Sequence, residues 1–448
     1  MNHFNDKLEF VAYGSKLLKH FVLVPSENKT SKYSQQVKGV ILSSFKSTKV
    51  VQSAFHSAVY LKTGDLVVGT HTGAVYTFKN NVFSKAISDA HKEKCKVGAL
   101  VLTSDGFASA ADDGVLKVWK DDLSPVGAIE LGKYKVRSLD FAAVGRGKFV
   151  VGTSSNTILE VNMEGKAPRV IMEGHSNELW GLGVHPTKPL FVTCGNDKTV
   201  RAWDCNVRKP VPGKVLVLKD EAICCNFSPD GATIAVGTNN GKIILVDYAS
   251  FAVTYEKKHR QELISAVAFS PGGQLLALAS WDQMAELIDM TSPAKNSVTL
   301  KGHTSSITHL TFSDDNKYLI TNSKDYEILF WSTETGKRVD KSITADTKWA
   351  DWSCILGFPV KGIFSKDQDG TDNNAAHVSY AADPTARMVV TGNDTGEVSL
   401  FRYPASYGAV KKYVGHSSHV TNVRFTRDNQ HVVSCGGNDT GVFLWRIA

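Results

Sequence analysis

KPLFVTCGNDKTVRAWDC, residues 188–205, decides the fold because it reads as two short strands joined by a tight turn. An apolar run with β-branched content begins at Leu190. Residues 195–198 then supply Gly, Asn and Asp, which accept the positive φ angles of a hairpin turn. From Val200 to Trp203 the residues alternate in character, as they do along a half-buried strand. The segment therefore predicts a β-hairpin.

The same pattern recurs as FASAADDGVLKVWK (107–120), YLITNSKDYEILFWS (318–332) and HVVSCGGNDTGVFLWR (431–446). In each copy an aspartate precedes a tryptophan by six residues, and a histidine precedes that aspartate by 22 or 23 residues. The four sets are His91, Asp113 and Trp119; His175, Asp197 and Trp203; His303, Asp325 and Trp331; and His416, Asp439 and Trp445. A fixed spacing of this length indicates one structural unit copied along the chain.

The period of the repeat sets the size of that unit. The last core positions of successive copies are 41–44 residues apart, except for two gaps of 57 and 70 residues that indicate insertions. These positions are Phe21, Phe78, Trp119, Val161, Trp203, Val246, Ile288, Trp331, Phe401 and Trp445. Four short strands and their turns fill one such period, the size of one β-propeller blade. The pair Trp203-Asp204 and the pairs Gly174-His175, Gly302-His303 and Gly415-His416 resemble those of WD-repeat β-propellers. We therefore predict an all-β propeller fold with about ten blades.

The repeated polar residues are expected to hold each blade together. In residues 175–203, Asp197 is expected to pair with His175, and the imidazole with Thr193, which in turn accepts the indole N–H of Trp203. Because the histidines recur at one offset, a structural role is favoured over catalysis. The copies that end at Val161, Val246 and Ile288 are expected to rest on apolar packing alone.

Several segments resemble the echinoderm microtubule-associated protein-like family, in particular the C-terminal part of its tandem propeller domain. The most specific stretch covers residues 349–426 and contains WADWSCILGFPVKGIF (349–364), VVTGNDTGEVSLF (389–401) and GHSSHVTNVRFT (415–426). GHSNELWGLGVHPTKPLFVT (174–193) and AVYTFKNN (74–81) fit the same family. Members usually carry more propeller before the point that corresponds to residue 1, and many have an N-terminal coiled coil.

The resemblance implies a non-enzymatic protein that binds tubulin or the microtubule lattice. It also implies a place in the cytoplasm and cytoskeleton, within a stable array such as the axoneme of a cilium or flagellum, with other cytoskeletal or axonemal proteins as partners. One alternative is a general protein-interaction scaffold with no cytoskeletal affinity. Another alternative, an enzyme, would need a polar cluster confined to one pocket.

The composition of the chain and its lack of certain motifs further restrict the class of protein. The 448 residues contain no apolar run of 18 and no signal-peptide core, so no membrane association is expected. The seven cysteines show neither disulfide nor zinc-ligand spacing, which favours a reducing, cytosolic compartment. Phosphate-binding loops, nucleophile elbows and metal-ligand motifs do not occur, so no cofactor and no catalytic residue is predicted.

The positive charge is concentrated near the N-terminus. Residues 1–100 hold 14 Lys, no Arg and 6 acidic residues, whereas the rest of the chain is close to neutral. The candidate partner-binding lysines are Lys29, Lys32, Lys38, Lys46 and Lys49. Such an excess attracts an acidic surface such as that of tubulin, but a solvated lysine-rich loop without a partner is the alternative. Lysine without arginine or interleaved aromatics argues against nucleic acid.

Ten copies exceed one propeller, which usually has about four to eight blades. We expect residues 1–130 to form about three blades of a partial N-terminal propeller. Residues 131–448 are expected to form a closed seven-bladed ring with an insertion at about 335–375. Three explanations of the partial ring stay open: the chain is a fragment, another polypeptide supplies blades, or the blades pack directly on a partner. Completion by a partner or by missing chain is favoured.

Two features of the insertion carry further expectations. Val360–Phe364 shares a V-K-G pattern with Val37–Ile41, so either segment is a candidate for the strand that closes a ring. Trp349 and Trp352 stand three residues apart, and they either pack between blades or anchor a binding partner.

Overall fold

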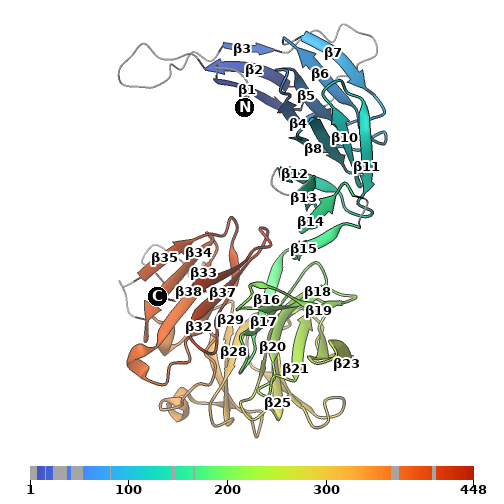
Figure 1. Cartoon of the computed structure of the whole chain (residues 1–448). Coiled ribbons are helices and arrows are strands. Elements are labelled where there is room, and N and C mark those ends of the chain that lie inside the picture. Colours follow the sequence, from blue (N-terminus) through green and yellow to red (C-terminus); the bar gives the residue numbers. More distant parts are fainter. Residues whose placement is uncertain are drawn as a thin grey trace, which may run out of the picture. The chain divides into compact units, whose positions relative to one another are not determined.

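The part of the chain that the structure describes folds into strands, tight turns and three short 3-10 helices. The structure, a computed structural model, describes residues 8–15, 17–23, 38–41, 54–80, 82–142, 147–164, 167–364, 373–405 and 410–447 (Figure 1). Its contacts divide the chain into two compact units, residues 1–174 and 175–448. Within the described ranges, no helix has the length and apolar character that a membrane crossing requires.

The first unit contains four antiparallel sheets of successive strands. The first sheet comprises β1 (Leu8–Gly14), β2 (Leu17–Leu23) and β3 (Lys38–Ile41). The second comprises β4 (Phe55–Tyr60), β5 (Leu66–Thr70), β6 (Val75–Lys79) and β7 (Val82–Ile87). The third comprises β8 (Val97–Leu102), β9 (Gly106–Ala111), β10 (Val115–Lys120) and β11 (Pro125–Glu130). The fourth comprises β12 (Val136–Ala142), β13 (Lys148–Thr153), β14 (Thr157–Asn162) and β15 (Arg169–Glu173).

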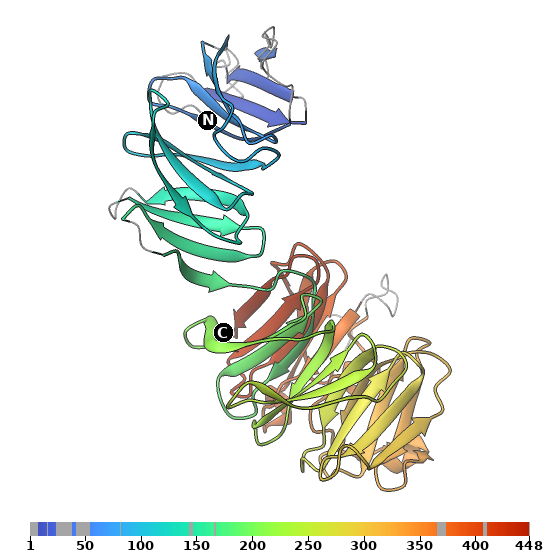
Figure 2. The same cartoon turned by 90° about the vertical axis from the view of Figure 1, so that its right-hand side faces the viewer.

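The second unit contains six such sheets, which Figure 2 shows in green, yellow, orange and red. The first three are β16 (Leu179–Val184), β17 (Leu190–Gly195), β18 (Thr199–Asp204) and β19 (Lys209–Val217); β20 (Ala222–Phe227), β21 (Thr233–Thr238), β22 (Lys242–Asp247) and β23 (Ala252–Lys258); and β24 (Ile264–Phe269), β25 (Leu275–Ser280), β26 (Met284–Asp289) and β27 (Ser297–Lys301). The last three are β28 (Ile307–Phe312), β29 (Tyr318–Ser323), β30 (Ile328–Ser332) and β31 (Arg338–Val339); β32 (Asn373–Val378), β33 (Met388–Asn393), β34 (Glu397–Arg402) and β35 (Val410–Val414); and β36 (Val420–Phe425), β37 (His431–Gly436) and β38 (Val442–Arg446).

The first strand of each sheet in the second unit lies against the first strand of the next, except that the insertion stands between β28 and β32, where the side chain of His309 makes the link, so the six sheets form a ring. The links between successive sheets are Cys225 Sγ to Val192 O (3.8 Å), Cys224 Sγ to Ile264 O (3.3 Å), Ser265 Oγ to Ile307 O (2.6 Å), His309 Nε2 to Asn374 O (3.1 Å), Asn374 Nδ2 to Val420 O (3.1 Å) and Asn422 Nδ2 to Trp180 O (3.3 Å). Gly181 permits the close approach of β16 to β20, because a Cβ there would lie 2.9 Å from Cys225 N. The propeller architecture predicted from the repeat is therefore confirmed.

The insertion after β31 runs beside the inner edge of β28. Trp349 forms an antiparallel bridge with Ser313, and Ala350 N donates to Phe312 O at 3.0 Å. The insertion contains the 3-10 helices η1 (Lys341–Thr344) and η2 (Phe358–Val360), and η3 (Pro384–Ala386) follows β32. At its far end, Val378 N of β32 donates to Trp352 O at 3.2 Å. The insertion thus fills the space between the sheets that begin with β28 and β32.

The division of the chain differs from the expected boundary near residue 130. The sheet of β12–β15 packs through Phe149, Val151 and Leu159 onto Ala108 and Leu116 of the preceding sheet. It therefore belongs to the first unit, which has four sheets instead of three. The ring that the hydrogen bonds close contains six sheets instead of seven, and the insertion occupies the remaining space.

The two candidate closing strands also differ from expectation. Val360–Phe364 is not a strand: Val360 ends η2, and Val360 and Ile363 are buried in the core of the insertion. Lys38–Ile41, by contrast, is β3 and pairs with β2 in the first sheet. Among the described strands, none pairs with the outer edge of β38, so its sheet has three strands.

Candidate functional site

Three sheets hold a continuous series of hydrogen bonds from a turn carboxylate to a tryptophan, which is buried for Trp119 and Trp203 and partly buried for Trp445. In the sheet of β16–β19, His175 Nδ1 donates to Asp197 Oδ2 at 2.9 Å, and Trp203 Nε1 donates to Thr193 Oγ1 at 2.7 Å. His175 Nε2 lies 2.7 Å from the same hydroxyl oxygen. The same arrangement joins His91, Asp113, Ser109 and Trp119, and joins His416, Asp439, Ser434 and Trp445.

The hydrogen bonds fix the proton positions in this chain. Each hydroxyl oxygen accepts the indole N–H, so its own proton points to His Nε2, and the imidazole carries its proton on Nδ1. Burial lowers the pKa of His91, His175 and His416, which keeps the rings neutral. Burial alone would raise the pKa of Asp197, but hydrogen bonds from His175 and Thr199 lower it to about 2. Each side chain of the series Asp, His, Ser or Thr, and Trp therefore has a hydrogen-bond partner.

The sheet of β28–β31 departs from the expected pairing. His303 Nδ1 donates to Glu327 Oε2 at 3.2 Å, and Trp331 Nε1 donates to Thr321 Oγ1 at 2.9 Å. Asp325 is exposed and accepts hydrogen bonds from Thr304 and Ser323 instead. The spacing placed the carboxylate in the right turn but assigned the contact with His303 to the wrong residue of that turn.

The sheet of β24–β27, whose last core position is Ile288, contains a charged network that the sequence analysis did not predict. Arg260 Nε donates to Asp282 Oδ2 at 3.0 Å, and His259 Nδ1 lies 2.9 Å from Glu286 Oε1. The expectation of purely apolar packing is therefore wrong for this sheet. A signal was available, because Arg260 stands 22 residues before Asp282, the offset that histidine keeps in the other copies.

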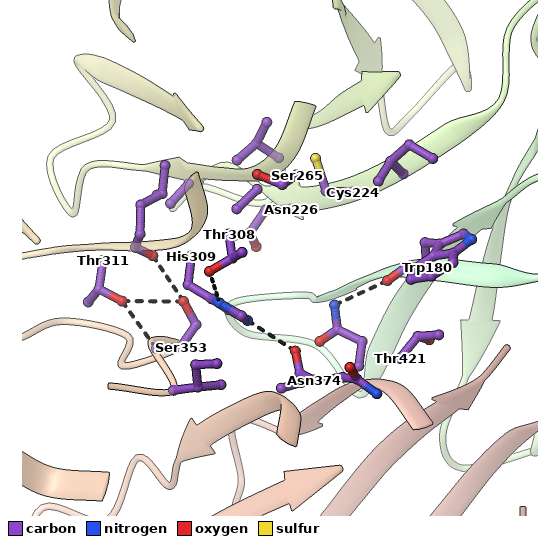
Figure 3. Close-up of a pocket in the computed structure, with 18 of the residues that line it drawn as sticks. Trp180, Cys224, Asn226, Ser265, Thr308, His309, Thr311, Ser353, Asn374 and Thr421 are labelled. Carbon is purple, nitrogen blue, oxygen red and sulfur yellow. Dashed lines mark hydrogen bonds between the residues drawn. The ribbon is translucent and has the colours of Figure 1, made fainter. Parts of the chain in front are cut away.

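The centre of the ring holds a cavity of about 690 Å³ (Figure 3). Inner strands and the insertion line it with a mixture of amide, hydroxyl and aromatic side chains, among them Trp180, Asn226, Ser265, His309 and Asn374. The charged residues in its lining are Glu221, Lys324, Asp351 and Arg424. Its volume and mixed lining are typical of a ligand pocket.

A buried polar cluster stands beside this cavity. His377 Nε2 donates to Asp351 Oδ1 at 2.6 Å, and the hydroxyl of Tyr380 donates to the same oxygen at 2.9 Å. His377 Nδ1 accepts the backbone N–H of Phe425 at 3.1 Å, which fixes the tautomer. Burial lowers the pKa of His377, while burial and the nearby carboxylate raise the pKa of Tyr380. The cluster ties the insertion to β32 and β36.

The two insertion tryptophans lie in different environments. Trp352 is 5% exposed and belongs to the core of the insertion, with its Nε1 donating to Cys354 O at 2.8 Å. Trp349 is half-buried and packs against Phe330 and Trp352, with ring centroids 6.0 Å apart in each pair. Both line a second cavity of about 910 Å³ beside Phe358, which is 78% exposed. Burial of Trp352 favours packing over partner binding for that residue.

The N-terminal lysines are only partly placed. Lys29, Lys32, Lys46 and Lys49 lie outside the described residues, and Lys38 begins β3. Lys62, Lys79, Lys85, Lys92 and Lys94 are described and exposed. Across the described residues, no group of three or more His, Cys, Asp or Glu side chains is arranged to hold a metal ion.

Comparison with known proteins shows which family this chain resembles. The sequence model described as the second β-propeller of echinoderm microtubule-associated protein matches residues 179–447. The chain is 35% identical over 405 residues to mouse echinoderm microtubule-associated protein-like 2, covering 87% of the chain and 60% of that protein. It is 32% identical over 419 residues to mouse echinoderm microtubule-associated protein-like 3, covering 87% and 45%.

The 77 kDa echinoderm microtubule-associated protein of Strongylocentrotus purpuratus is 33% identical over 404 residues, covering 87% of the chain and 57% of that protein. The chain thus spans about half the length of the curated relatives it matches. Since the family's second propeller covers more than half of the chain, the chain belongs to the echinoderm microtubule-associated protein family.

Proposed function

We propose that the chain is a non-enzymatic propeller protein that binds tubulin or the microtubule lattice through its propeller surfaces. One observation carries the proposal: the match extends over 87% of the chain to relatives whose names describe microtubule association. The seven free cysteines, six of them buried, support a reducing cytoplasm and cytoskeleton as its location. A stable array such as an axoneme would add avidity to a weak individual contact.

The lysine-rich first hundred residues are the proposed source of electrostatic attraction to an acidic lattice. The test is co-sedimentation of the whole chain with microtubules at about 0.05 and about 0.3 M salt, where screening weakens exposed charge pairs. A variant with Lys29, Lys32, Lys38, Lys46 and Lys49 changed to Gln is expected to pellet less. The matched control changes five exposed lysines of the second unit to Gln: Lys188, Lys209, Lys219, Lys258 and Lys301.

Three outcomes separate the alternatives. Salt-sensitive pelleting that only the N-terminal variant loses supports both the function and the assigned lysines. Equal loss in both variants supports microtubule binding but contradicts the assignment to the N-terminal region. If the unmodified chain does not pellet at either salt concentration, the microtubule proposal fails and the scaffold alternative is favoured.

We infer in addition that a further blade covers the sheet of β12–β15. Its outward face exposes Val150 (40%), Ile158 (37%) and Met172 (37%), while its other face is packed. Adjacent apolar side chains of this kind are typical of a buried face that lacks its neighbour. The blade would come from a longer form of the protein or from another cytoskeletal polypeptide. If the isolated chain is monomeric and binds no hydrophobic dye, this inference fails.

A further inference from the structure

Arg424 lines the central cavity, and its guanidinium makes no hydrogen bond or ion pair with any described residue. Asp351 lines the same cavity, and it is already bonded through Oδ1 to His377 and Tyr380. Both Arg424 and Arg427 act on the charge of Asp351. Of the two arginines, Arg424 lines the cavity, whereas Arg427 lies over the ring of Tyr380 at 3.8 Å.

Other polar groups of the lining also lack a protein partner. Asn373 is 4% exposed, yet its Nδ2 makes no hydrogen bond within the described chain, and neither does Trp180 Nε1. On the acceptor side, Asn196 Oδ1 and Asn422 Oδ1 are buried without a donor. All four residues line the same cavity. Buried polar groups are almost always hydrogen-bonded, so a cluster of this kind points to a ligand.

The arrangement of donors and acceptors indicates the class of ligand. They come from β16, β32, β36 and the turn after β17, which belong to three neighbouring sheets, so they line one side of the space. The backbone of an extended peptide offers alternating N–H and C=O groups to such a set. A guanidinium binds a carboxylate with two parallel hydrogen bonds. Aromatic surface is available nearby, since Trp281 also lines the cavity and is 43% exposed.

We propose that the central cavity of the second unit binds an extended peptide segment of a partner protein, with Arg424 holding a carboxylate of that peptide. The carboxylate is either an acidic side chain or the C-terminal carboxylate. Figure 3 shows Trp180, Asn374 and Thr421 among the residues that line the cavity. The site does not include the lysines proposed for microtubule contact, so peptide binding and microtubule binding can be tested independently.

The test uses the whole chain and fluorescein-labelled peptides of glycine and serine, followed by fluorescence anisotropy. One peptide has a central glutamate and an amidated C-terminus, the second has glutamine in its place, and the third has glutamine and a free C-terminal carboxylate. A carboxylate peptide is expected to bind roughly tenfold or more tightly than the glutamine amide, as a charge-assisted pair provides. The peptide that gains affinity identifies the source of the carboxylate.

Arg424→Gln is expected to remove this preference, whereas Arg446→Gln, which changes an exposed arginine outside the cavity, is expected to retain it. Circular dichroism checks that each variant is folded. Equal binding of all three peptides, no binding of any, or an unchanged preference in Arg424→Gln would overturn the proposal. If Arg424→Gln does not fold, the comparison of the three peptides on the unmodified chain still decides.

Discussion

Asp351 of the insertion and His377 of β32 are joined at 2.6 Å across 26 residues of sequence. The same carboxylate oxygen accepts the hydroxyl of Tyr380, and the other imidazole nitrogen accepts the N–H of Phe425 on β36. An irregular segment is thereby fixed to two strands of the ring. The contact explains how a propeller with six sheets remains closed at the position of the insertion.

Asp351→Ala is expected to lower the free energy of unfolding by about 2–3 kcal/mol. The substitution leaves the buried N–H of His377 and the hydroxyl of Tyr380 without an acceptor, and unsatisfied donors of this kind are costly. Asp351→Asn keeps an acceptor oxygen and should cost less. Urea unfolding followed by tryptophan fluorescence measures both values. Equal stability of the alanine variant and the unmodified chain would show that the cluster contributes nothing.

Much of the fold was predictable because the turn chemistry repeats. Asp113, Asp197 and Asp439 keep one spacing to tryptophan, since each closes a similar hairpin and reaches the same histidine. In the sheet of β28–β31, the carboxylate that accepts the hydrogen bond of His303 belongs to Glu327 instead of Asp325. Spacing identifies a turn, but the rotamers and the width of the turn decide which of two acidic side chains contacts the imidazole.

Other parts of the molecule were not predictable from spacing. The network of Arg260 and Asp282 was missed because arginine replaced the histidine that defined the pattern. The sheet of β12–β15 has the same period as its neighbours, so only the packing of its Phe149 onto Leu116 of the preceding sheet assigns it to the first unit. The contact between Asp351 and His377 joins an irregular insertion to a strand, and no local periodicity marks it.

Asp197→Ala is expected to destabilise the chain more than Asp325→Ala. Asp197 is almost completely buried and accepts bonds from His175, the backbone of Ser176 and Thr199, so its loss should cost about 3 kcal/mol. Asp325 is exposed and accepts hydrogen bonds from the hydroxyl groups of Thr304 and Ser323, so its loss should cost less than about 1 kcal/mol.

The two aspartate variants are compared by urea denaturation at neutral pH. They are matched, because each removes the aspartate that stands six residues before a tryptophan. If Asp325→Ala proved as costly as Asp197→Ala, the assignment of Glu327 as the partner of His303 would be wrong. Glu327→Ala then serves as the control, with an expected cost of about 1 kcal/mol because its carboxylate is partly exposed.

The stability of the chain should fall as the pH drops from 7.5 to 5, in part because of His309. Burial, together with the charge of Arg424, lowers the pKa of this imidazole from 6.5 to about 4, and the hydrogen bond to Asn374 O acts in the opposite direction. The unfolded chain takes up the proton near pH 6.5, whereas the folded chain does so only near pH 4. Acidification within this window therefore favours unfolding, by about 1–2 kcal/mol for this group because part of the ring faces the cavity.

His309→Gln tests the origin of this pH dependence. Glutamine can donate to Asn374 O, as His309 Nε2 does at 3.1 Å, but it does not titrate. The difference in unfolding free energy between pH 7.5 and pH 5 should shrink in this variant. The buried histidines of the sheets, such as His175, also have a lowered pKa and leave a residual slope. An unchanged slope would remove His309 as a contributor.

Trp352→Ala is expected to cost about 3–5 kcal/mol, because it removes a buried indole from the core of the insertion. The packing there is tight: a Cβ at Gly357 would collide with the ring, so the backbone is shaped around it. Trp349→Ala removes a half-buried ring that faces the second cavity, and it should cost roughly half as much. Thermal unfolding of the two variants under the same conditions gives the comparison. If Trp352→Ala left stability intact while abolishing association with a partner, the indole would be a binding anchor and its role in packing would be wrong.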